Sequence, residues 1–147
     1  MKILVINGPN LNMLGQRDPA HYGVKTLAEI EALVEKRAAE LGVEVEFFQS
    51  NLEGEIVGRV QGSASRFAGV VINPGPLTHY GRSMSDALLD THLPVVEVHL
   101  SNIHAREEFR SHSVIAPIAL GQIAGLGWQG YLFALEFLVA HLKPGSD

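Results

Sequence analysis

The chain has 147 residues, of which 46% are hydrophobic and 18% are charged, and these values are ordinary for a globular protein. Its net charge of −5 argues against nucleic-acid or anionic-membrane partners, because such partners select basic proteins. The absence of cysteine excludes disulfides, thiolate catalysis and cysteine-ligated zinc or iron–sulfur sites. No apolar run reaches the ~20 residues of a membrane span, so we expect a cytoplasmic protein.

Apolar runs typical of strands alternate with amphipathic stretches typical of helices along the chain. The first run, residues 3–6, leads into a long polar loop. A helical pattern follows at residues 26–42, where Thr26 and Glu29 form a candidate capping box and Gly42 is a stop signal. Further strands are expected near residues 43–49, 69–73, 94–100 and 118–125, and further helices near residues 52–65, 79–92 and 128–142.

Five strand–helix units with short connections indicate a parallel sheet that is covered by helices on both faces. At this size the usual solution is the flavodoxin-like strand order 2-1-3-4-5. We therefore predict an α/β fold of three layers with a five-stranded parallel sheet. The chain shows no repeat, linker or low-complexity segment, so we expect a single domain over residues 1–147, with a short polar tail at residues 143–147.

The loop after the first strand is far longer than the ~2–6 residues usual between a strand and a helix. It carries Asn10, Arg17 and Tyr22 among prolines and glycines, so we expect an ordered, functional loop. Gly15 and Gly23 bracket its Arg–Tyr segment and are candidate hinges of a lid. The ordinary alternatives are turn asparagines, a surface ion pair and a tyrosine that packs on the core.

Ligands of such sheets bind at the carboxyl ends of the strands. In the fourth predicted strand, Glu97, His99 and Ser101 alternate and therefore point to one face, which is costly in a buried strand unless each is satisfied. A structural hydrogen-bond network would explain any one of them, but their combination favours a site. The other polar residues near these strand ends are Asn73 and His79 after the third strand, and Arg106 and Arg110 beyond the fourth.

Other chemistries fit the sequence less well. His99 and His104 do not have the spacing of a closed metal site, so we expect no metal. The chain lacks a glycine-rich phosphate loop, so we expect no flavin or nucleotide cofactor. Ser101 near His99 suggests a hydrolase, but no G-x-S-x-G elbow is present. The second alternative is a flavodoxin-like module that binds a small ligand without turnover and does not require Tyr22.

The motifs NGPNLNMLGQRDP, NPG-LTHY, EVHLSNIHAREEFR and GQIAGLG-QGY, taken in order, resemble the type II 3-dehydroquinate dehydratases over essentially the whole chain. The resemblance implies a catalytic domain that removes water from 3-dehydroquinate by anti elimination through an enolate, giving 3-dehydroshikimate without cofactor or metal. It also implies an active-site lid at residues 15–24 and a homododecamer, a tetramer of trimers. The reaction would serve the shikimate pathway of aromatic amino acid and chorismate biosynthesis, or quinate catabolism.

By position, the resemblance makes Tyr22 the base that removes the proton beside the ketone. Arg17, on the same lid, would favour the ionised form of that phenol. Asn10 would hold the water that stabilises the enolate oxygen. His99, oriented by Glu97, would protonate the departing hydroxyl. The long loop would thus supply the base and the enolate stabiliser, and the fourth strand would supply the acid that elimination requires.

The same resemblance implies a set of substrate-binding groups. Ser101 and the backbone N–H of Leu100 would grip the substrate carboxylate, and Asp86 would reach into the site of a neighbouring subunit. The full expected set is Asn73, which would also help to position the acid, His79 and Arg110, which would bind ring hydroxyls, Asp86, Leu100 and Ser101.

Three positions depart from the family pattern. Leu52 stands where the family usually has His, Pro76 where Ala or Gly is common, and Gly81 where Ser is usual. Pro76 has no N–H with which to contact a substrate, and Gly81 removes a hydroxyl near His79. None of the three changes the expected acid or base.

Overall fold

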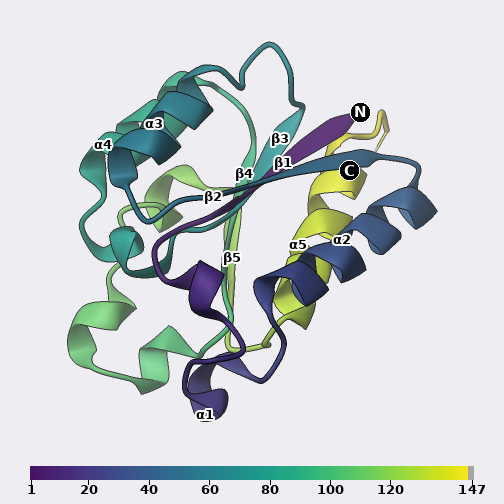
Figure 1. The fold of residues 1–147 in the computed structure, drawn as a ribbon. Coiled ribbons are helices and arrows are strands. Elements are labelled where there is room, and N and C mark those ends of the chain that lie inside the picture. Colours follow the sequence, from purple (N-terminus) through teal and green to yellow (C-terminus); the bar gives the residue numbers. More distant parts are fainter. Residues whose placement is uncertain (146–147) are drawn as a thin grey trace.

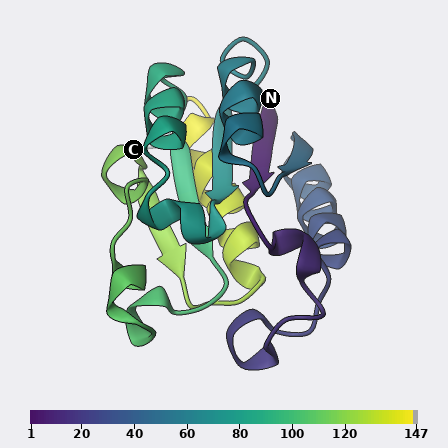
Figure 2. The same cartoon turned by 60° about the vertical axis from the view of Figure 1, so that its left-hand side comes forward.

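The computed structural model describes residues 1–145 and builds them around one sheet with helices on both faces (Figures 1 and 2). All neighbouring strands pair in parallel, in the order β2-β1-β3-β4-β5. This confirms the predicted flavodoxin-like fold of three layers and its strand order 2-1-3-4-5. The strands are β1 (Lys2–Asn7), β2 (Glu44–Gln49), β3 (Gly69–Asn73), β4 (Val95–His99) and β5 (Gly121–Ala124).

Two helices cover each face of the sheet. Helices α2 (Leu27–Leu41) and α5 (Gln129–Leu142) pack together on one side, and α3 (Glu53–Gln61) and α4 (Arg82–Asp90) on the other (Figure 1). A further short helix, α1 (Pro19–Tyr22), lies in the loop after β1. None of the helices within residues 1–145 is long and apolar enough to cross a membrane.

The start of α2 follows the predicted pattern. Thr26 Oγ1 accepts a hydrogen bond from the backbone N–H of Glu29 at 3.2 Å, and the Glu29 carboxylate accepts one from the N–H of Thr26 at 2.9 Å. Gly42 ends the helix in the left-handed region, at φ 74°. These local signals fix where the helix lies along the chain, and its buried Ile30, Val34 and Ala38 hold it against the sheet.

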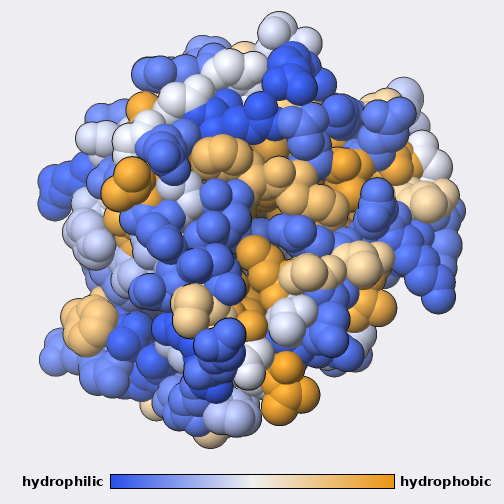
Figure 3. Space-filling model, viewed as in Figure 1, coloured by the Kyte–Doolittle hydropathy of each residue, from blue (hydrophilic) through white to orange (hydrophobic). Residues whose placement is uncertain are grey.

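Alternation along the central strands divides the core into two parts. Ile3 and Val5 of β1 face α2 and α5, whereas Leu4 and Ile6 face α3 and α4. Both faces of β1, β3 and β4 are therefore buried, which explains their uninterrupted apolar runs. The edge strand β2 is only partly buried, and apolar side chains gather over it on the surface seen in Figure 3.

Several element boundaries differ from the sequence prediction. The loop at residues 7–25, expected to be irregular, contains a 3₁₀ turn, η1 (Leu11–Met13), and α1. The helix expected at residues 79–92 begins only at Arg82, because the chain first forms η2 (Gly75–His79). The helix expected at 52–65 stops at Gln61, and the strand expected at 118–125 covers only residues 121–124 because Ala116–Ile118 form η5. Residues 146–147 of the expected tail lie outside the described part.

Candidate active site

A cavity of about 220 Å³ opens beyond the carboxyl ends of β1, β3 and β4. The loop after β1 and the segment after β4 extend from the sheet at this end (Figure 2). Nine of the eleven predicted site residues line it, which leaves out Glu97 and Asp86. The complete lining is Asn10, Leu11, Arg17, Tyr22, Asn73, Gly75, Pro76, His79, His99, Leu100, Ser101, Ile103, Arg106 and Arg110.

Two loops meet closely at the base of this cavity, and glycine makes the approach feasible. The N–H of Gly8 donates to the carbonyl of Asn73 at 2.8 Å, and a Cβ on Gly8 would lie 2.2 Å from the carbonyl oxygen of Pro74. Gly75 has φ +58°, and a Cβ there would lie 2.9 Å from the carbonyl oxygen of Pro9. The Gly–Pro and Pro–Gly pairs of the two loops therefore lock β1 and β3 together where the site begins.

A buried tyrosine fixes the orientation of Asn73. The Tyr131 hydroxyl donates to Asn7 Oδ1 at 2.6 Å and accepts from Asn73 Nδ2 at 2.9 Å, while Asn73 Oδ1 accepts from the N–H of Gly75 at 3.1 Å. Burial raises the pKa of Tyr131 well above its ordinary value, so this phenol remains a protonated donor. Asn73 therefore meets the cavity in one amide orientation. Sequence reasoning did not single out Tyr131.

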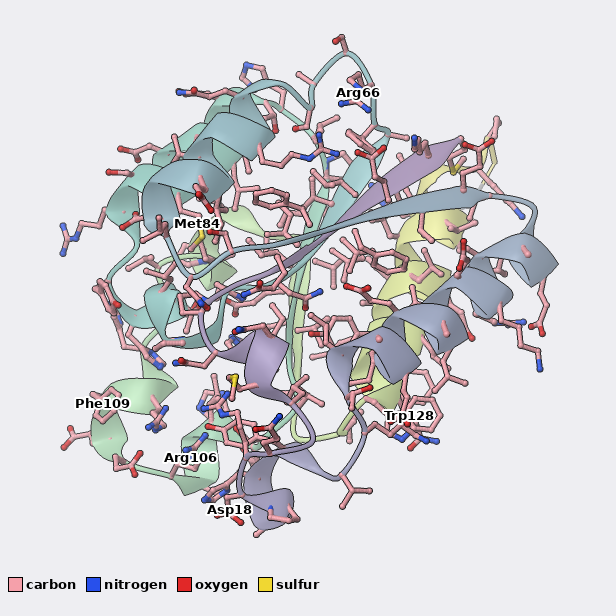
Figure 4. The ribbon with its side chains drawn as sticks, viewed as in Figure 1. Asp18, Arg66, Met84, Arg106, Phe109 and Trp128 are labelled. Carbon is pink, nitrogen blue, oxygen red and sulfur yellow. The ribbon has the colours of Figure 1, made fainter. Side chains whose placement is uncertain are left out.

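Tyr22 lies between two guanidinium groups. The Arg17 guanidinium carbon stacks 3.7 Å from the centre of the Tyr22 ring, and Arg106 Nη1 donates to the Tyr22 hydroxyl oxygen at 2.9 Å. The hydroxyl oxygen is thus held by a cation at the cavity, an arrangement that suits a general base. Arg106 received no role from the sequence, and its only signal was its place beyond the fourth strand. Figure 4 shows Arg106 at the end of the sheet away from Arg66.

Arg106 also donates a hydrogen bond to Ser101. Its Nη1 donates to Ser101 Oγ at 3.1 Å, so the proton of the serine hydroxyl remains available to an acceptor in the cavity. Three arginines line the cavity, and no aspartate or glutamate among residues 1–145 does. The cavity therefore favours an anion, although the whole chain carries a net charge of −5.

Glu97 and His99 lie on one face of β4, as their alternation predicted, and both are buried. His99 Nε2 lies 3.6 Å from Glu97 Oε2, which is an ion-pair distance and longer than a hydrogen bond. Burial raises the pKa of Glu97, but His99, Ser113 and Thr78 together outweigh it and hold the pKa below the ordinary 4.5. Glu97 is therefore a carboxylate at neutral pH, and it lies on the Nε2 side of the His99 ring, so Nδ1 is the ring nitrogen left for a ligand.

Three neutral side chains that the sequence reasoning missed hold the Glu97 carboxylate. Thr78 Oγ1 and Ser113 Oγ donate to Oε1, and Gln122 Nε2 donates to Oε2. One signal was available, because the alignment of β4 with β5 pairs Glu97 with Gln122. A buried carboxylate needs donors, so polar residues on neighbouring strands were the candidates.

His79 and Arg110 lie in the cavity wall as expected. His79 Nδ1 lies 2.7 Å from the backbone carbonyl of His112. A carbonyl only accepts, so Nδ1 donates, and neutral His79 can present Nε2 to a hydroxyl of a ligand. Arg110 Nε donates to Glu107. Both residues therefore meet a ligand from the segment that follows β4 or from η2.

Of the two predicted site residues that do not line the cavity, Glu97 lies behind His99, whereas Asp86 lies apart from the site. It is exposed on α4 and borders a separate hollow together with Arg82 and His112. Within residues 1–145, no group of three or more histidine, aspartate or glutamate side chains could hold a metal ion.

The three departures from the family pattern have different surroundings. Pro76 lines the cavity and Leu52 is 61% exposed outside it. The N–H of Gly81 donates to the carbonyl of Leu77 at 2.6 Å, and a Cβ at this position would lie 2.7 Å from the same oxygen. The backbone as folded here thus leaves no room for a serine at position 81.

The comparisons with known proteins agree with this geometry. The family model "Dehydroquinase class II" matches residues 1–139. The chain is 59% identical to the 3-dehydroquinate dehydratase of Endomicrobium trichonymphae, over 95% of this chain and 97% of that protein. It is 54% identical to the 3-dehydroquinate dehydratase of Halothermothrix orenii, over 99% and 98%. The crystal structure of type II dehydroquinase from Propionibacterium acnes matches with a TM-score of 0.90 at 45% identity, over 94% and 95%. The predicted resemblance is confirmed, and the chain belongs to the class II dehydroquinase family.

Proposed function

We propose that this chain dehydrates 3-dehydroquinate to 3-dehydroshikimate by anti elimination through an enolate, without a cofactor. The names of its relatives support this reaction. The observation that carries the proposal is the pairing of two groups in one cavity. A phenol beside two guanidiniums, Tyr22, and an imidazole beside a buried carboxylate, His99, both line it. Elimination next to a ketone needs a base and an acid of this kind.

In the first step, Tyr22 as a phenolate takes the proton from the carbon beside the ketone. The electrons of the broken C–H bond move into the enolate, whose oxygen becomes negative. Asn10 lines the cavity and is proposed to hold the water that stabilises this oxygen. Arg17 stacks on the Tyr22 ring and Arg106 donates to its oxygen, so both place positive charge beside the phenolate.

In the second step, the enolate collapses to the ketone and expels the hydroxyl from the neighbouring carbon. His99 donates its Nδ1 proton to that hydroxyl, which leaves as water, and a carbon–carbon double bond remains. Glu97 stays ionised and stabilises the imidazolium beforehand. Tyr22 has gained one proton and His99 has lost one, so exchange with solvent resets both groups.

Substrate binding is assigned to the cavity walls. Ser101 and the N–H of Leu100 would hold the substrate carboxylate, and His79 and Arg110 would hold ring hydroxyls, with Asn73 fixed beside them. The excess of arginine supports an anionic substrate.

Further proposals concern assembly and setting. The exposed position of Asp86 suits a residue that completes the site of a neighbouring subunit, within a dodecamer made of four trimers. We place residues 15–24 as a lid on a single catalytic domain, residues 1–147, of a cytoplasmic enzyme. Its reaction would serve the shikimate pathway or quinate breakdown.

The hydrolase alternative has little support in the site. In the described residues, the side chain that hydrogen-bonds Ser101 Oγ is Arg106, and a guanidinium cannot act as the base that activates a serine. The binding-module alternative does not explain why an ionised carboxylate is buried beside His99 at a cost in desolvation.

The test is an ultraviolet assay with purified protein and 3-dehydroquinate, because the product has a conjugated chromophore that the substrate lacks. We expect absorbance to rise with the wild-type protein and to stay flat with Tyr22→Phe. Calorimetric titration of both proteins with the substrate measures binding separately. Binding without a change in absorbance in the wild type would contradict the proposal and favour a binding module.

A further inference from the structure

Glu97 is the most deeply buried charged side chain of the site, with 0% of its surface exposed, and its surroundings come from three separate elements. Thr78 lies in η2, Ser113 in the loop after η4 (Glu108–Ser111), and Gln122 in β5. Thr78 and Ser113 serve Oε1, with Ser113 Oγ at 2.6 Å, and Gln122 serves Oε2. We call Thr78, Ser113 and Gln122 the Glu97 cradle.

The hydroxyl and amide protons of the cradle indicate which protonation state of Glu97 the cradle favours. The two hydroxyls lie 2.9 Å apart, and each contributes one proton. If Glu97 is ionised, both protons can point to Oε1, and the amide of Gln122 donates to Oε2. If Oε1 carried a proton, that proton would have to meet a hydroxyl oxygen, and one of the two donors would have to turn away. The cradle therefore disfavours a proton on Oε1, and its three donors stabilise the negative charge of the carboxylate.

The charge state of Glu97 also depends on few neighbours. The titratable group that contacts it is His99, on the same strand, at 3.6 Å. The groups that contact it from η2, from the loop after η4 and from β5 are the neutral members of the cradle. The oxygen that accepts from Gln122, Oε2, is also the one that lies 3.6 Å from His99 Nε2.

We propose that Thr78, Ser113 and Gln122 are positioning residues of the elimination, because they hold Glu97 as a carboxylate and aim Oε2 at His99 Nε2. This inference rests on the proposed function, in which His99 is the acid. The cradle would keep the His99 ring in the orientation that presents its Nδ1 proton to the leaving hydroxyl.

The cradle also connects the acid to the substrate-binding wall. The N–H of Val114 donates to the carbonyl of Thr78 at 2.7 Å, and the carbonyl of His112 accepts from His79 Nδ1 at 2.7 Å. The segment at residues 112–114 thus supports both Glu97, through Ser113, and His79. A shift of this segment would disturb acid and binding group together.

Thr78 and Gln122 are the best positions for a test. Ser113 Oγ also accepts from the N–H groups of Ile115 and Ala116, so removing it would loosen the turn as well. Thr78→Val removes the hydroxyl but keeps the shape, Thr78→Ser keeps the hydroxyl, and Gln122→Met removes the donor at similar length.

The matched control is Ser63→Ala. Ser63 is also fully buried, and its hydroxyl donates to the carbonyl of Val60 at 2.6 Å, just beyond α3 and away from the cavity. Its loss should lower the melting temperature without changing kcat. A cradle residue with a merely structural role would behave in the same way.

The experiment measures kcat, KM and their pH dependence for each variant. We expect Thr78→Val and Gln122→Met to lose about ten- to a hundredfold in kcat, as for one hydrogen bond to a charged group, while KM changes less than about twofold. The loss should be greater at pH 5 than at pH 8, because Glu97 without a donor accepts a proton more readily. Thr78→Ser should retain most of the activity.

The outcomes separate this inference from the proposed function. No turnover by the wild-type protein would overturn the proposed function itself. An active wild type whose Thr78→Val and Gln122→Met variants match Ser63→Ala, in kcat and in pH profile, would overturn the role of the cradle alone. If Thr78→Val does not fold, Gln122→Met decides, since Gln122 lies on a partly exposed edge strand.

Discussion

The cavity lies between two parts of the chain that differ in burial. We call the loop after β1, which carries Arg17 and Tyr22, the loop wall, and β4, which carries Glu97 and His99, the strand wall. Tyr22 ends a four-residue helix, none of whose residues is buried, and its hydroxyl is held by Arg106 alone among the described residues. Glu97 and His99 stand on a central strand, where Glu97 is 0% and His99 5% exposed, and three donors hold the carboxylate.

This difference in burial indicates that the two walls of the site differ in how easily they open. Segments with few buried contacts open at little cost in free energy, whereas a central strand opens only when the protein unfolds. We therefore expect the base to arrive with the lid and the acid to be set in advance by the fold. Such a division admits the substrate on one side without disturbing the proton donor on the other.

The largest effect should come from removing the oxygen of the base. Tyr22→Phe keeps the ring on which Arg17 stacks at 3.7 Å, so the wall itself should persist. We expect kcat to fall about 10⁴-fold, at the upper end for loss of a general base, with substrate still bound. Steady-state kinetics and calorimetry check this. A variant with most of its activity would place the base elsewhere and leave the loop only a lid.

The next largest effect on kcat should come from a change in the strand wall. Glu97→Gln replaces one acceptor oxygen with an amide that can only donate, among donors from Thr78, Ser113 and Gln122. We expect kcat to fall about 10²-fold with little change in KM, and His99→Ala to fall at least as far. Near-normal turnover in His99→Ala would make β4 a binding surface only.

A change at Arg17 tests the loop after β1 with a smaller expected effect. Arg17→Gln removes a cation that stacks on Tyr22, and we expect kcat at neutral pH to fall about 30-fold, equivalent to ~2 kcal/mol. Arg17→Lys should restore only part of the loss, since an ammonium lacks the planar fork. Steady-state kinetics of the three proteins measure this, and equal rates for all would remove Arg17 from the mechanism.

The charge of Glu97 in the strand wall should also affect how the free energy of unfolding depends on pH. The folded protein holds the pKa of Glu97 below 4.5, so its ionisation stabilises the fold above about pH 4.5 and this contribution is lost as the pH falls through the folded pKa. We expect the free energy of unfolding of wild type to exceed that of Glu97→Gln most at pH 7, and the gap to narrow below pH 4.5. Urea unfolding at several pH values measures it. A constant gap would contradict the assigned charge.

The last effect is on stability alone and comes from the backbone two residues beyond His79, which lines the cavity. Gly81→Ser would place a Cβ 2.7 Å from the carbonyl oxygen of Leu77, and we expect a loss of about 1–3 kcal/mol, as for overpacking. The matched control is Gly58→Ser, on α3, where a Cβ would meet nothing within 4 Å. Thermal unfolding compares the two. Equal stability of both variants would show that the backbone at Gly81 adjusts freely.

The sequence predicted the strands and long helices of the fold better than the short helical turns of its loops. The apolar runs of β1, β3 and β4 and the capping box at Thr26 are local signals, and both appear as predicted. The turns η2 and η5 were missed because 3₁₀ turns have no periodic pattern of their own. The short helix α1 was missed although Asp18 and Pro19 are ordinary cap residues, because the loop was treated as irregular throughout.

The residues of the candidate site also fall into those that the sequence predicted and those that it did not. The residues at the strand ends were found because parallel topology alone brings them together. The cradle of Glu97 was not, since Thr78, Ser113 and Gln122 lie far apart in the chain and only the folded structure brings their donors to one carboxylate. Arg106 was noticed without a role for the same reason, because its contact with Tyr22 spans 84 positions.

The buried phenol of Tyr131 gives the molecule a spectroscopic property. The chain has three tyrosines, Tyr22, Tyr80 and Tyr131, and burial keeps the last protonated where ordinary phenols, with a pKa of about 10, lose their protons. Absorbance titration of the folded protein would then lack the tyrosinate signal of Tyr131 until denaturation exposes this ring. Tyr80→Phe, which replaces a ring that is 61% exposed, leaves one phenol at the cavity and one in the core, so denaturation alone would add the signal of the core phenol.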